Sequence, residues 1–149
     1  MVIEELLSIS DEQVEELLAL MNELNSEIYV DADMLRRVAS STSSHLFVMK
    51  ERDGRIIGTA TLCVFDSPTG QKAHVEDVVV LSTYRGQGLG RVLMEHLIDY
   101  ARKELVKVDI QLTSSPFRLA ANGMYKAMGF QQKETNVYKM VIKDTRSVE

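Results

Sequence analysis

The stretch that decides the fold spans residues 78–90 and reads VVVLSTYRGQGLG. Its Val-rich start is typical of a strand that is buried on both faces of a sheet. The glycines that follow predict a tight turn, because glycine adopts backbone conformations that other residues avoid. An apolar series with a period of three to four residues then indicates a helix, and it comprises Leu89, Leu93, Leu97 and Tyr100. The stretch therefore predicts a strand, a glycine turn and a helix in direct succession.

Two helices are predicted upstream of this stretch. Ser10 and Gln13 form a capping box in front of an apolar series of helical period, which predicts a helix over residues 11–25. A second, shorter helical pattern follows, with Asp31 or Asp33 as its N-cap. Both helices precede the main part of the predicted sheet.

Extended segments account for most of the remaining upstream chain, and they cover residues 2–9, 45–51, 55–65 and 73–81. The second and third of these are joined by Arg52-Asp53-Gly54, whose Asp-Gly pair predicts a hairpin. The last one ends in the Val-rich stretch and is expected at the centre of the sheet.

The downstream chain is predicted to add a strand, a helix and a strand pair. The strand covers 106–112, and the helix starts with Ser115 as N-cap and Pro116 as first helical residue and stops at Gly129. The strand pair covers 130–134 and 137–142. Hairpins combined with one strand-helix-strand unit indicate the α+β (mixed α/β) class, and residues 1–149 are expected to form a single domain.

The composition excludes several classes of function. The chain has 149 residues, 45% of them apolar, and its apolar runs fall far short of the roughly 18 residues that span a bilayer. Its acidic start is unlike a secretory signal, so a cytoplasmic protein with no membrane partner is expected. A net charge of -5 argues against a nucleic-acid partner. One cysteine and three scattered histidines give no metal-ligand spacing, so no metal is expected.

The glycine turn has a chemistry of its own. A turn that runs into a helix N-terminus presents unpaired backbone N–H groups and the positive end of the helix dipole, which together bind phosphate. Arg85 and Arg91 bracket this turn with positive charge. The Lys-Ser/Thr pair of a P-loop is missing, and so is the glycine spacing of the dinucleotide fingerprint. The alternative to a phosphate-binding turn is a tight strand-to-helix connection that binds no ligand.

Two blocks of the sequence resemble the GNAT superfamily of N-acyltransferases. Residues 78–90 resemble its acyl-CoA-binding signature, whose loop reads Arg/Gln-x-x-Gly-x-Gly/Ala, and residues 118–130 resemble its closing motif. The order of the predicted elements agrees with this family over residues 2–142. The resemblance implies a central, mostly antiparallel, twisted sheet of six to seven strands, with about four flanking helices and splayed central strands.

The resemblance also implies acetyl-CoA as the co-substrate. Its pyrophosphate would lie on the backbone N–H groups of Gln87 through Arg91, and its pantetheine arm would pair with the backbone near Val80 as an extra strand does. The thioester would lie where the strands 73–81 and 106–112 part. The implied cofactor-binding residues are Val78, Val79, Val80, Arg85, Gly86, Gln87, Gly88, Leu89, Gly90, Arg91, Asn122 and Tyr125.

The last predicted helix carries three polar side chains on one face, since Arg118, Asn122 and Tyr125 are spaced i, i+4 and i+7. By resemblance, Tyr125 is the general acid that protonates the leaving thiolate, and Asn122 hydrogen-bonds the pantetheine arm. The alternatives are a tyrosine that packs beside the core and an asparagine that faces solvent. Arg118 either meets a phosphate of the cofactor or lies along the surface.

The amine substrate must lose a proton before it attacks, and Glu76 and Asp77 are the candidate acids of the strand. Glu76 resembles the family's frequent glutamate base, and Asp77 is a candidate anchor for the substrate amine. Strict alternation puts Glu76 with Val78 and Val80 on one face and Asp77 with Val79 on the other. A β-bulge, common near active sites, would bring both acids to one place. The alternative is ordinary surface charge.

The remaining reactive side chains are assigned to structure. Cys63 is expected in the core without a histidine partner, and His96 lies within an amphipathic helix. His74 lies at the start of the strand predicted over 73–81, two residues before Glu76, where it either touches the substrate or is a solvated strand end.

These patterns predict an acetyl-CoA-dependent N-acetyltransferase that acts on a primary amine of a small molecule or peptide by direct attack, without an acyl-enzyme. Residues 74–80 resemble the strand of glucosamine-phosphate N-acetyltransferases, which makes that activity the first alternative. A non-catalytic GNAT-like module that binds acyl-CoA is the second, and an unrelated binder of nucleotide phosphates is the third. A homodimer through the sheet edge at 137–142 is a further expectation.

Overall fold

A computed structural model describes residues 1–144 of the chain, in two compact units. The first unit, Met1–Thr113, holds every strand of the described residues, and the second begins at Ser114. In chain order, the first unit contains β1 (Val2–Glu5), α1 (Asp11–Leu24), α2 (Ala32–Ser40), β2 (Ser44–Lys50), β3 (Ile56–Ser67), β4 (Gly70–Val80), a 3-10 turn (Ser82–Tyr84), α3 (Leu89–Glu104) and β5 (Asp109–Gln111).

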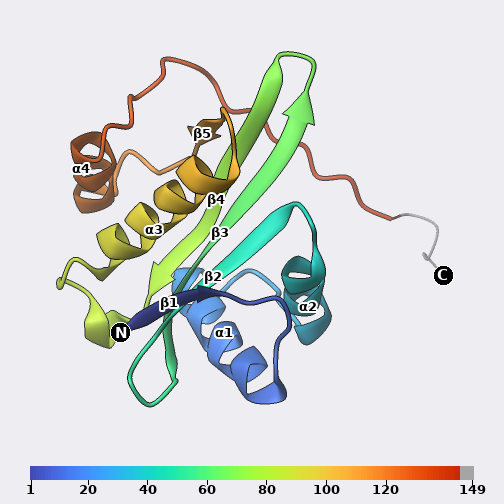
Figure 1. Ribbon diagram of the computed structural model, residues 1–149, viewed down its shortest axis with the longest axis vertical. Coiled ribbons are helices and arrows are strands. Elements are labelled where there is room, and N and C mark those ends of the chain that lie inside the picture. The colour runs from blue at the N-terminus through green and yellow to red at the C-terminus, as the bar shows by residue number, and fades with distance from the viewer. Residues whose placement is uncertain (145–149) are drawn as a thin grey trace. The chain divides into compact units, whose positions relative to one another are not determined.

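The five strands form one sheet in the order β1-β2-β3-β4-β5 (Figure 1). The first three pairings are antiparallel and the β4–β5 pairing is parallel, as a mixed but mostly antiparallel sheet requires. The middle strand is β3, so the expectation that the 73–81 strand is central is wrong by one position. Both β3 and β4 are internal strands, which explains the apolar sequence of each.

The short strand β5 lies beside only the first part of β4. They pair only where Lys72–His74 lie beside Asp109–Gln111. The remainder of β4, residues 75–80, has no strand on that side, although its other side is paired with β3. This unpaired edge agrees with the predicted splay, and it leaves backbone groups of β4 open next to the glycine turn.

The two upstream helices begin where the sequence predicts. Ser10 accepts a hydrogen bond from the Gln13 backbone N–H and the Gln13 side chain bonds the Ser10 backbone N–H, which completes the capping box of α1. Asp31 accepts from the Met34 backbone N–H at 2.9 Å, so Asp31 rather than Asp33 is the N-cap of α2.

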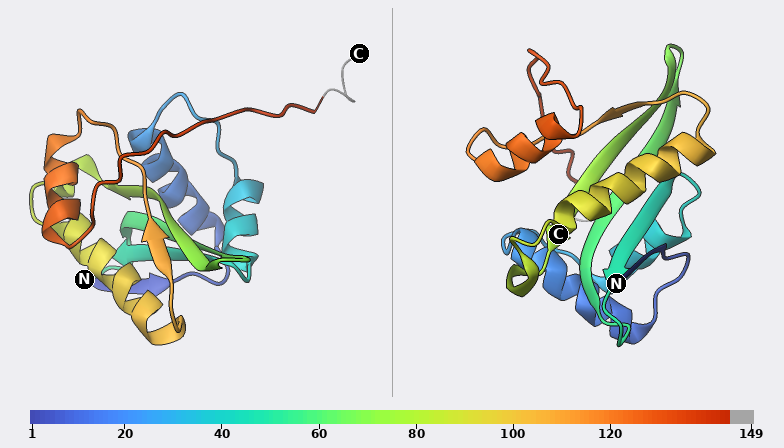
Figure 2. Two further views of the ribbon diagram at one scale, coloured as in Figure 1. Left: turned by 90° about the horizontal axis from the view of Figure 1, so that it is seen from above. Right: turned by 60° about the vertical axis from the view of Figure 1, so that its left-hand side comes forward.

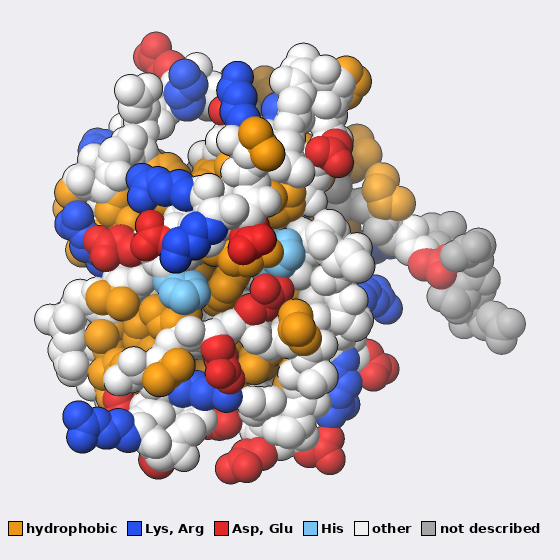
Figure 3. Space-filling view, viewed as in Figure 1, with side chains coloured by type: hydrophobic (Ala, Val, Ile, Leu, Met, Phe, Trp, Pro, Cys, Tyr) orange, Lys and Arg blue, Asp and Glu red, His pale blue; other side chains and the backbone are white. Residues whose placement is uncertain are grey.

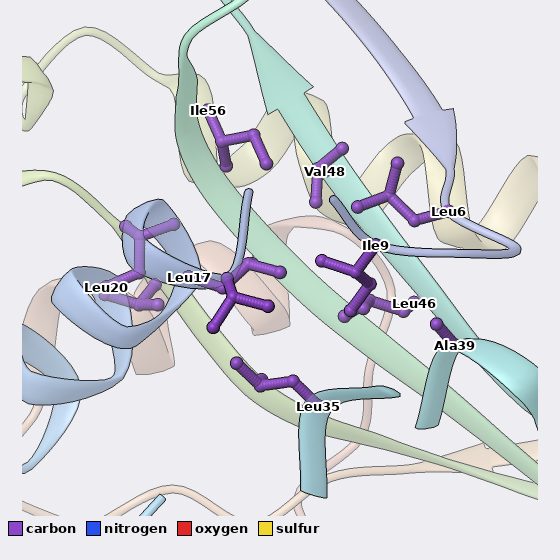
Figure 4. Packing of buried hydrophobic residues seen from close by; sticks show 11 residues of the cluster. Leu6, Ile9, Leu17, Leu20, Leu35, Ala39, Leu46, Val48 and Ile56 are labelled. Atoms are coloured by element: carbon purple, nitrogen blue, oxygen red, sulfur yellow. The ribbon is translucent and has the colours of Figure 1, made fainter. Parts of the chain in front are cut away.

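Helices cover both faces of the sheet (Figure 2). The helices α1 and α2 pack on one face, where they form an apolar cluster with residues of β2, β3 and β4 (Figure 4). The helix α3 packs on the other face, and its Tyr100 and His96 rings contact Phe47 of β2 edge-on. The residues of the first cluster are Leu6, Ile9, Val14, Leu17, Leu20, Leu35, Ala39, Leu46, Val48, Ile56 and Val79.

Replacing Leu17 with Ala tests the cluster between α1 and the sheet. Leu17 is fully buried, so its truncation removes apolar contacts and leaves a cavity, at an expected cost of about 2–5 kcal/mol in the free energy of unfolding. Urea denaturation measures this cost. The matched control is Leu7→Ala, because Leu7 is 73% exposed, and a loss as large in the control would contradict the packing described here.

The described part of the second unit, residues 114–144, contains one helix, α4 (Leu119–Ala127). The helix begins later than predicted, because Ser115 does not cap it: the Ser115 carbonyl accepts the Arg118 backbone N–H and closes a turn that contains Pro116. The end is as predicted, since Gly129 has a φ of 101° directly after the last turn.

Residues 130–144 contain no strand, so the predicted strand pair is wrong and the sheet has five strands rather than six or seven. An alternating sequence forms a strand only where a neighbouring strand accepts its backbone hydrogen bonds, and no ladder involves this segment. The apolar side chains of 137–142 are exposed instead. The expected dimer edge at 137–142 therefore loses its structural basis. Among the helices of residues 1–144, none is long and apolar enough to cross a membrane.

Candidate active site

A β-bulge interrupts β4 at the two candidate acids. Thr61 lies opposite Glu76 and Thr59 lies opposite Val79, so two residues of β4 face a single residue of β3. Asp77 carries the change in direction with a φ of 54°, in the left-handed region that Asp tolerates better than most residues. Both Glu76 and Asp77 are exposed. The β-bulge that the sequence analysis considered as an alternative to a regular strand is therefore present.

The bulge changes which residues of β4 share a face. Glu76 and Val79 both point to the side of α1 and α2, because their partners on β3 continue the row that carries Leu46 and Val48. Val80 lies on the opposite side, with the row that faces α3. The strict alternation that grouped Glu76 with Val78 and Val80 is therefore wrong, since it assumed a regular strand.

The glycine turn leads into α3 without a side-chain cap. Gly88 is the N-cap residue, with a φ of 76°, and Gly86 has a φ of 78°. Within residues 1–144, no acceptor is bonded to the backbone N–H groups from Gly86 through Arg91, and the first helical bond of this region runs from Val92 to Gly88. A row of unpaired donors at a helix N-terminus is a site for a polyanion.

The space above this turn is open. A Cβ added to Gly86, Gly88 or Gly90 would meet no atom within 4 Å, so internal packing does not explain these glycines. The positive φ values account for Gly86 and Gly88, whereas Gly90 is left free for a close approach by a ligand. The residues present therefore fit the pyrophosphate of coenzyme A.

Hydrogen bonds from side chains of α1 and of the turn hold the segment between the end of β4 and the glycine turn. Glu23 of α1 accepts hydrogen bonds from the Ser82 backbone N–H at 2.9 Å and from the Ser82 hydroxyl at 3.2 Å. Arg85 donates from Nε to the Val80 carbonyl oxygen at 3.1 Å. The end of β4, the 3-10 turn and α1 are thereby tied together, and the start of α3 is held next to the parted strands.

The two arginines that bracket the turn both have acidic partners. An Arg85 guanidinium nitrogen lies 3.6 Å from a Glu23 carboxylate oxygen, and Arg91 donates to Glu95 at 2.9 Å on the same helix. Acidic and basic side chains are interspersed on the face of the molecule that Figure 3 shows. The positive field at this turn therefore comes mainly from backbone N–H groups and the helix dipole.

The closing block lies on α4 of the second unit. Tyr125 is 9% exposed and its ring packs edge-on against Phe130, with centroids 6.0 Å apart. Burial raises the pKa of Tyr125, and the charge of Arg118 opposes that rise to a smaller extent. Asn122 donates from its amide nitrogen to the Ser115 carbonyl at 3.0 Å, which braces the turn before the helix. Arg118 is exposed and sits at the N-cap position.

Within residues 1–144, the hydrogen-bond partner of the Cys63 sulfur is a serine and not a histidine. Cys63 lies directly opposite His74 in the β3–β4 pairing, and Ser44 donates a weak hydrogen bond to its sulfur at 3.9 Å. The Cys63 side chain is half-buried, and that burial raises the pKa of its thiol, which keeps it in the unreactive form.

The geometry defines an α+β protein in which a row of unpaired backbone N–H groups at a helix start follows a strand with an open edge. Residues 11–130 match the family model of the "Acetyltransferase (GNAT) family". A curated relative, glucosamine 6-phosphate N-acetyltransferase of Trypanosoma brucei brucei, is 36% identical over 109 residues, covering 69% of this chain and 67% of the relative.

Two further comparisons agree with that match. The human N-acetyltransferase 8B is 26% identical over 112 residues, 70% of this chain, and the matched part spans 49% of the human protein's length. The solved structure of glucosamine-6-phosphate N-acetyltransferase from Arabidopsis thaliana superposes with a TM-score of 0.74 at 20% identity, covering 94% of this chain and 99% of that chain. The chain therefore belongs to the GNAT family of acetyltransferases.

Proposed function

We propose that the protein transfers an acetyl group from acetyl-CoA to a primary amine. The row of unpaired backbone N–H groups from Gly86 through Arg91, under open space, carries this proposal together with the family membership. The co-substrate would supply an activated thioester carbonyl and a thiolate leaving group. The chain itself would bind the diphosphate, take protons from the amine and return one to the thiolate.

The unpaired edge of β4 gives the pantetheine arm a place to bind. The Leu81 backbone N–H donates to Ile57 on the β3 side, so the Val80 carbonyl of the same peptide unit points to the side where β5 has parted. The Val80 carbonyl oxygen accepts a hydrogen bond from Arg85. The other backbone N–H and C=O groups of Val78 through Val80 that face this side would then pair with an extended ligand. Asn122 retains its side-chain carbonyl as an acceptor for the same arm.

Glu76 is the proposed base. It stands next to the bulge, its carboxylate is exposed, and its strand runs directly into the proposed cofactor loop. Asp77, at the bulge itself, is the proposed anchor for the substrate ammonium group. Tyr125 is the proposed acid, because a buried phenol with a raised pKa keeps its proton at neutral pH.

Glu76→Gln is expected to lower kcat by roughly 100-fold or more, since general base catalysis contributes about 10²–10⁴-fold. The Kd for acetyl-CoA should not change, because the cofactor loop is intact. Release of free thiol in the presence of an amine panel measures the activity. Glu15→Gln, an exposed acid on α1, is the matched control and should behave like the wild type. Equal activity of Glu76→Gln and the wild type would remove Glu76 from the mechanism.

A phosphorylated amino sugar is the second candidate acceptor. It is favoured by the 36% identity to the trypanosomal glucosamine 6-phosphate enzyme. Thiol release with glucosamine 6-phosphate but not with peptide amines would assign this acceptor, and the opposite pattern would exclude it. Cofactor binding without turnover of any amine would instead favour a non-catalytic module. A single domain over 1–149, a cytoplasmic location and a homodimer stay predictions from the sequence.

A further inference from the structure

We propose that His74 is the outlet through which the proton taken up by Glu76 reaches solvent. This inference rests on the proposed function and adds a residue to it. His74 and Glu76 lie on the same face of β4, with Nδ1 of the imidazole 3.8 Å from Oε1 of the carboxylate. Their side chains are 40% and 52% exposed, so the pair connects the bulge with bulk water.

The proton balance of the reaction requires that one proton reaches solvent in each turnover. A protonated amine that becomes an amide loses two protons, and the departing thiolate takes one of them. One proton per turnover must therefore leave the site. Glu76 would accept it from the ammonium group, neutral His74 would take it from the carboxyl at Nδ1, and the imidazolium would release a proton to solvent from Nε2. Glu76 is then a carboxylate again, and the neutral imidazole returns to its starting tautomer by exchanging its Nδ1 proton for one at Nε2 through solvent before the next turnover.

The residues around His74 hold its ring in place, and none of those described below brings a second charged group to the imidazole besides Glu76. Its ring packs edge-on against Phe65 of β3, with centroids 5.5 Å apart. Cys63 lies opposite on β3, with a thiol that burial keeps protonated, and the uncharged Gln111 lies opposite on β5. On β4 itself, Lys72 is bonded to hydroxyl groups of the hairpin turn, and within residues 1–144 Glu76 is the carboxylate within ion-pair distance of the imidazole.

A double-mutant cycle tests the relay, with thiol release from the full chain as the assay. His74→Gln is expected to lower kcat by about 10-fold or more without changing the KM for acetyl-CoA. Because His74 acts through Glu76, the same substitution should have no further effect in the Glu76→Gln background. His96→Gln, a histidine of α3 outside the site, is the control and should leave kcat unchanged.

Two further readouts separate a relay from a merely structural role. His74→Ala should regain activity when imidazole is added, because free imidazole can accept the proton in place of the missing side chain, and added imidazole should have no effect on the double variant His74→Ala, Glu76→Gln. An active wild type with independent, additive losses in the cycle, or with an unaffected His74→Gln, overturns the relay alone. A wild type that binds acetyl-CoA but acetylates no amine overturns the proposed activity, and the relay with it.

Discussion

Gly88→Glu is expected to abolish binding of acetyl-CoA. The new carboxylate would project into the open space above the turn, where the N–H groups of the α3 start are unpaired, and would lie against the diphosphate. Like charges in contact cost several kcal/mol, which corresponds to a rise in Kd of at least about 100-fold. Isothermal titration calorimetry with acetyl-CoA measures this change directly.

The control for this variant is Gly54→Glu. Gly54 lies in the hairpin turn between β2 and β3, with a φ of 88° and open space around it, so the substitution brings the same charge and a similar backbone strain. Its Kd for acetyl-CoA should equal that of the wild type. If Gly88→Glu, folded as judged by circular dichroism, bound acetyl-CoA as tightly as Gly54→Glu does, the phosphate-binding turn would be refuted.

Tyr125→Phe is expected to lower kcat by about 10²–10⁴-fold, the usual contribution of a general acid. The substitution removes only the hydroxyl group and leaves the ring packed against Phe130. The deficit should persist through the neutral and mildly basic range and shrink only where the wild type loses the Tyr125 proton, because the pKa of this phenol is raised by burial. A pH series of thiol release with saturating acetyl-CoA measures both effects.

The raised pKa of Tyr125 determines how the kcat of the wild type depends on pH. A phenol whose pKa is raised by burial stays protonated beyond about pH 10, so the wild type should keep its proton donor throughout the neutral and mildly basic range. Tyr138→Phe is the matched control, since Tyr138 is 88% exposed in the same unit. Loss of activity in both variants, or in neither, would contradict the role of Tyr125.

The sequence predicted elements whose signals are local. The capping box at Ser10 and the Asp-Gly pair at Asp53 each specify a boundary through bonds between near neighbours, and both boundaries are confirmed. The glycine turn and the start of α3 were also predicted correctly, because positive φ at Gly86 and Gly88 is a local requirement. These are the parts of the candidate site that the sequence could locate.

The errors occur where the outcome depends on partners distant in sequence. The bulge at Asp77 reverses the faces of β4 beyond it, and alternation alone cannot detect such a shift. The late start of α4 has a local cause instead, namely the turn that the Ser115 carbonyl closes with the Arg118 N–H. Residues 137–142 alternate like a strand, yet a strand also needs a neighbour with free backbone groups.

Because α3 has no side-chain cap at Gly88, binding of a ligand there would also stabilise the fold. Most helices complete their first turn with a serine, threonine or aspartate of their own, and α3 has none. In the proposed complex, the diphosphate of the coenzyme accepts hydrogen bonds from these first N–H groups, as a capping side chain does in other helices. The folded state would then gain stability in proportion to the logarithm of free coenzyme, so a metabolite pool would act on the protein's lifetime as well as on its turnover.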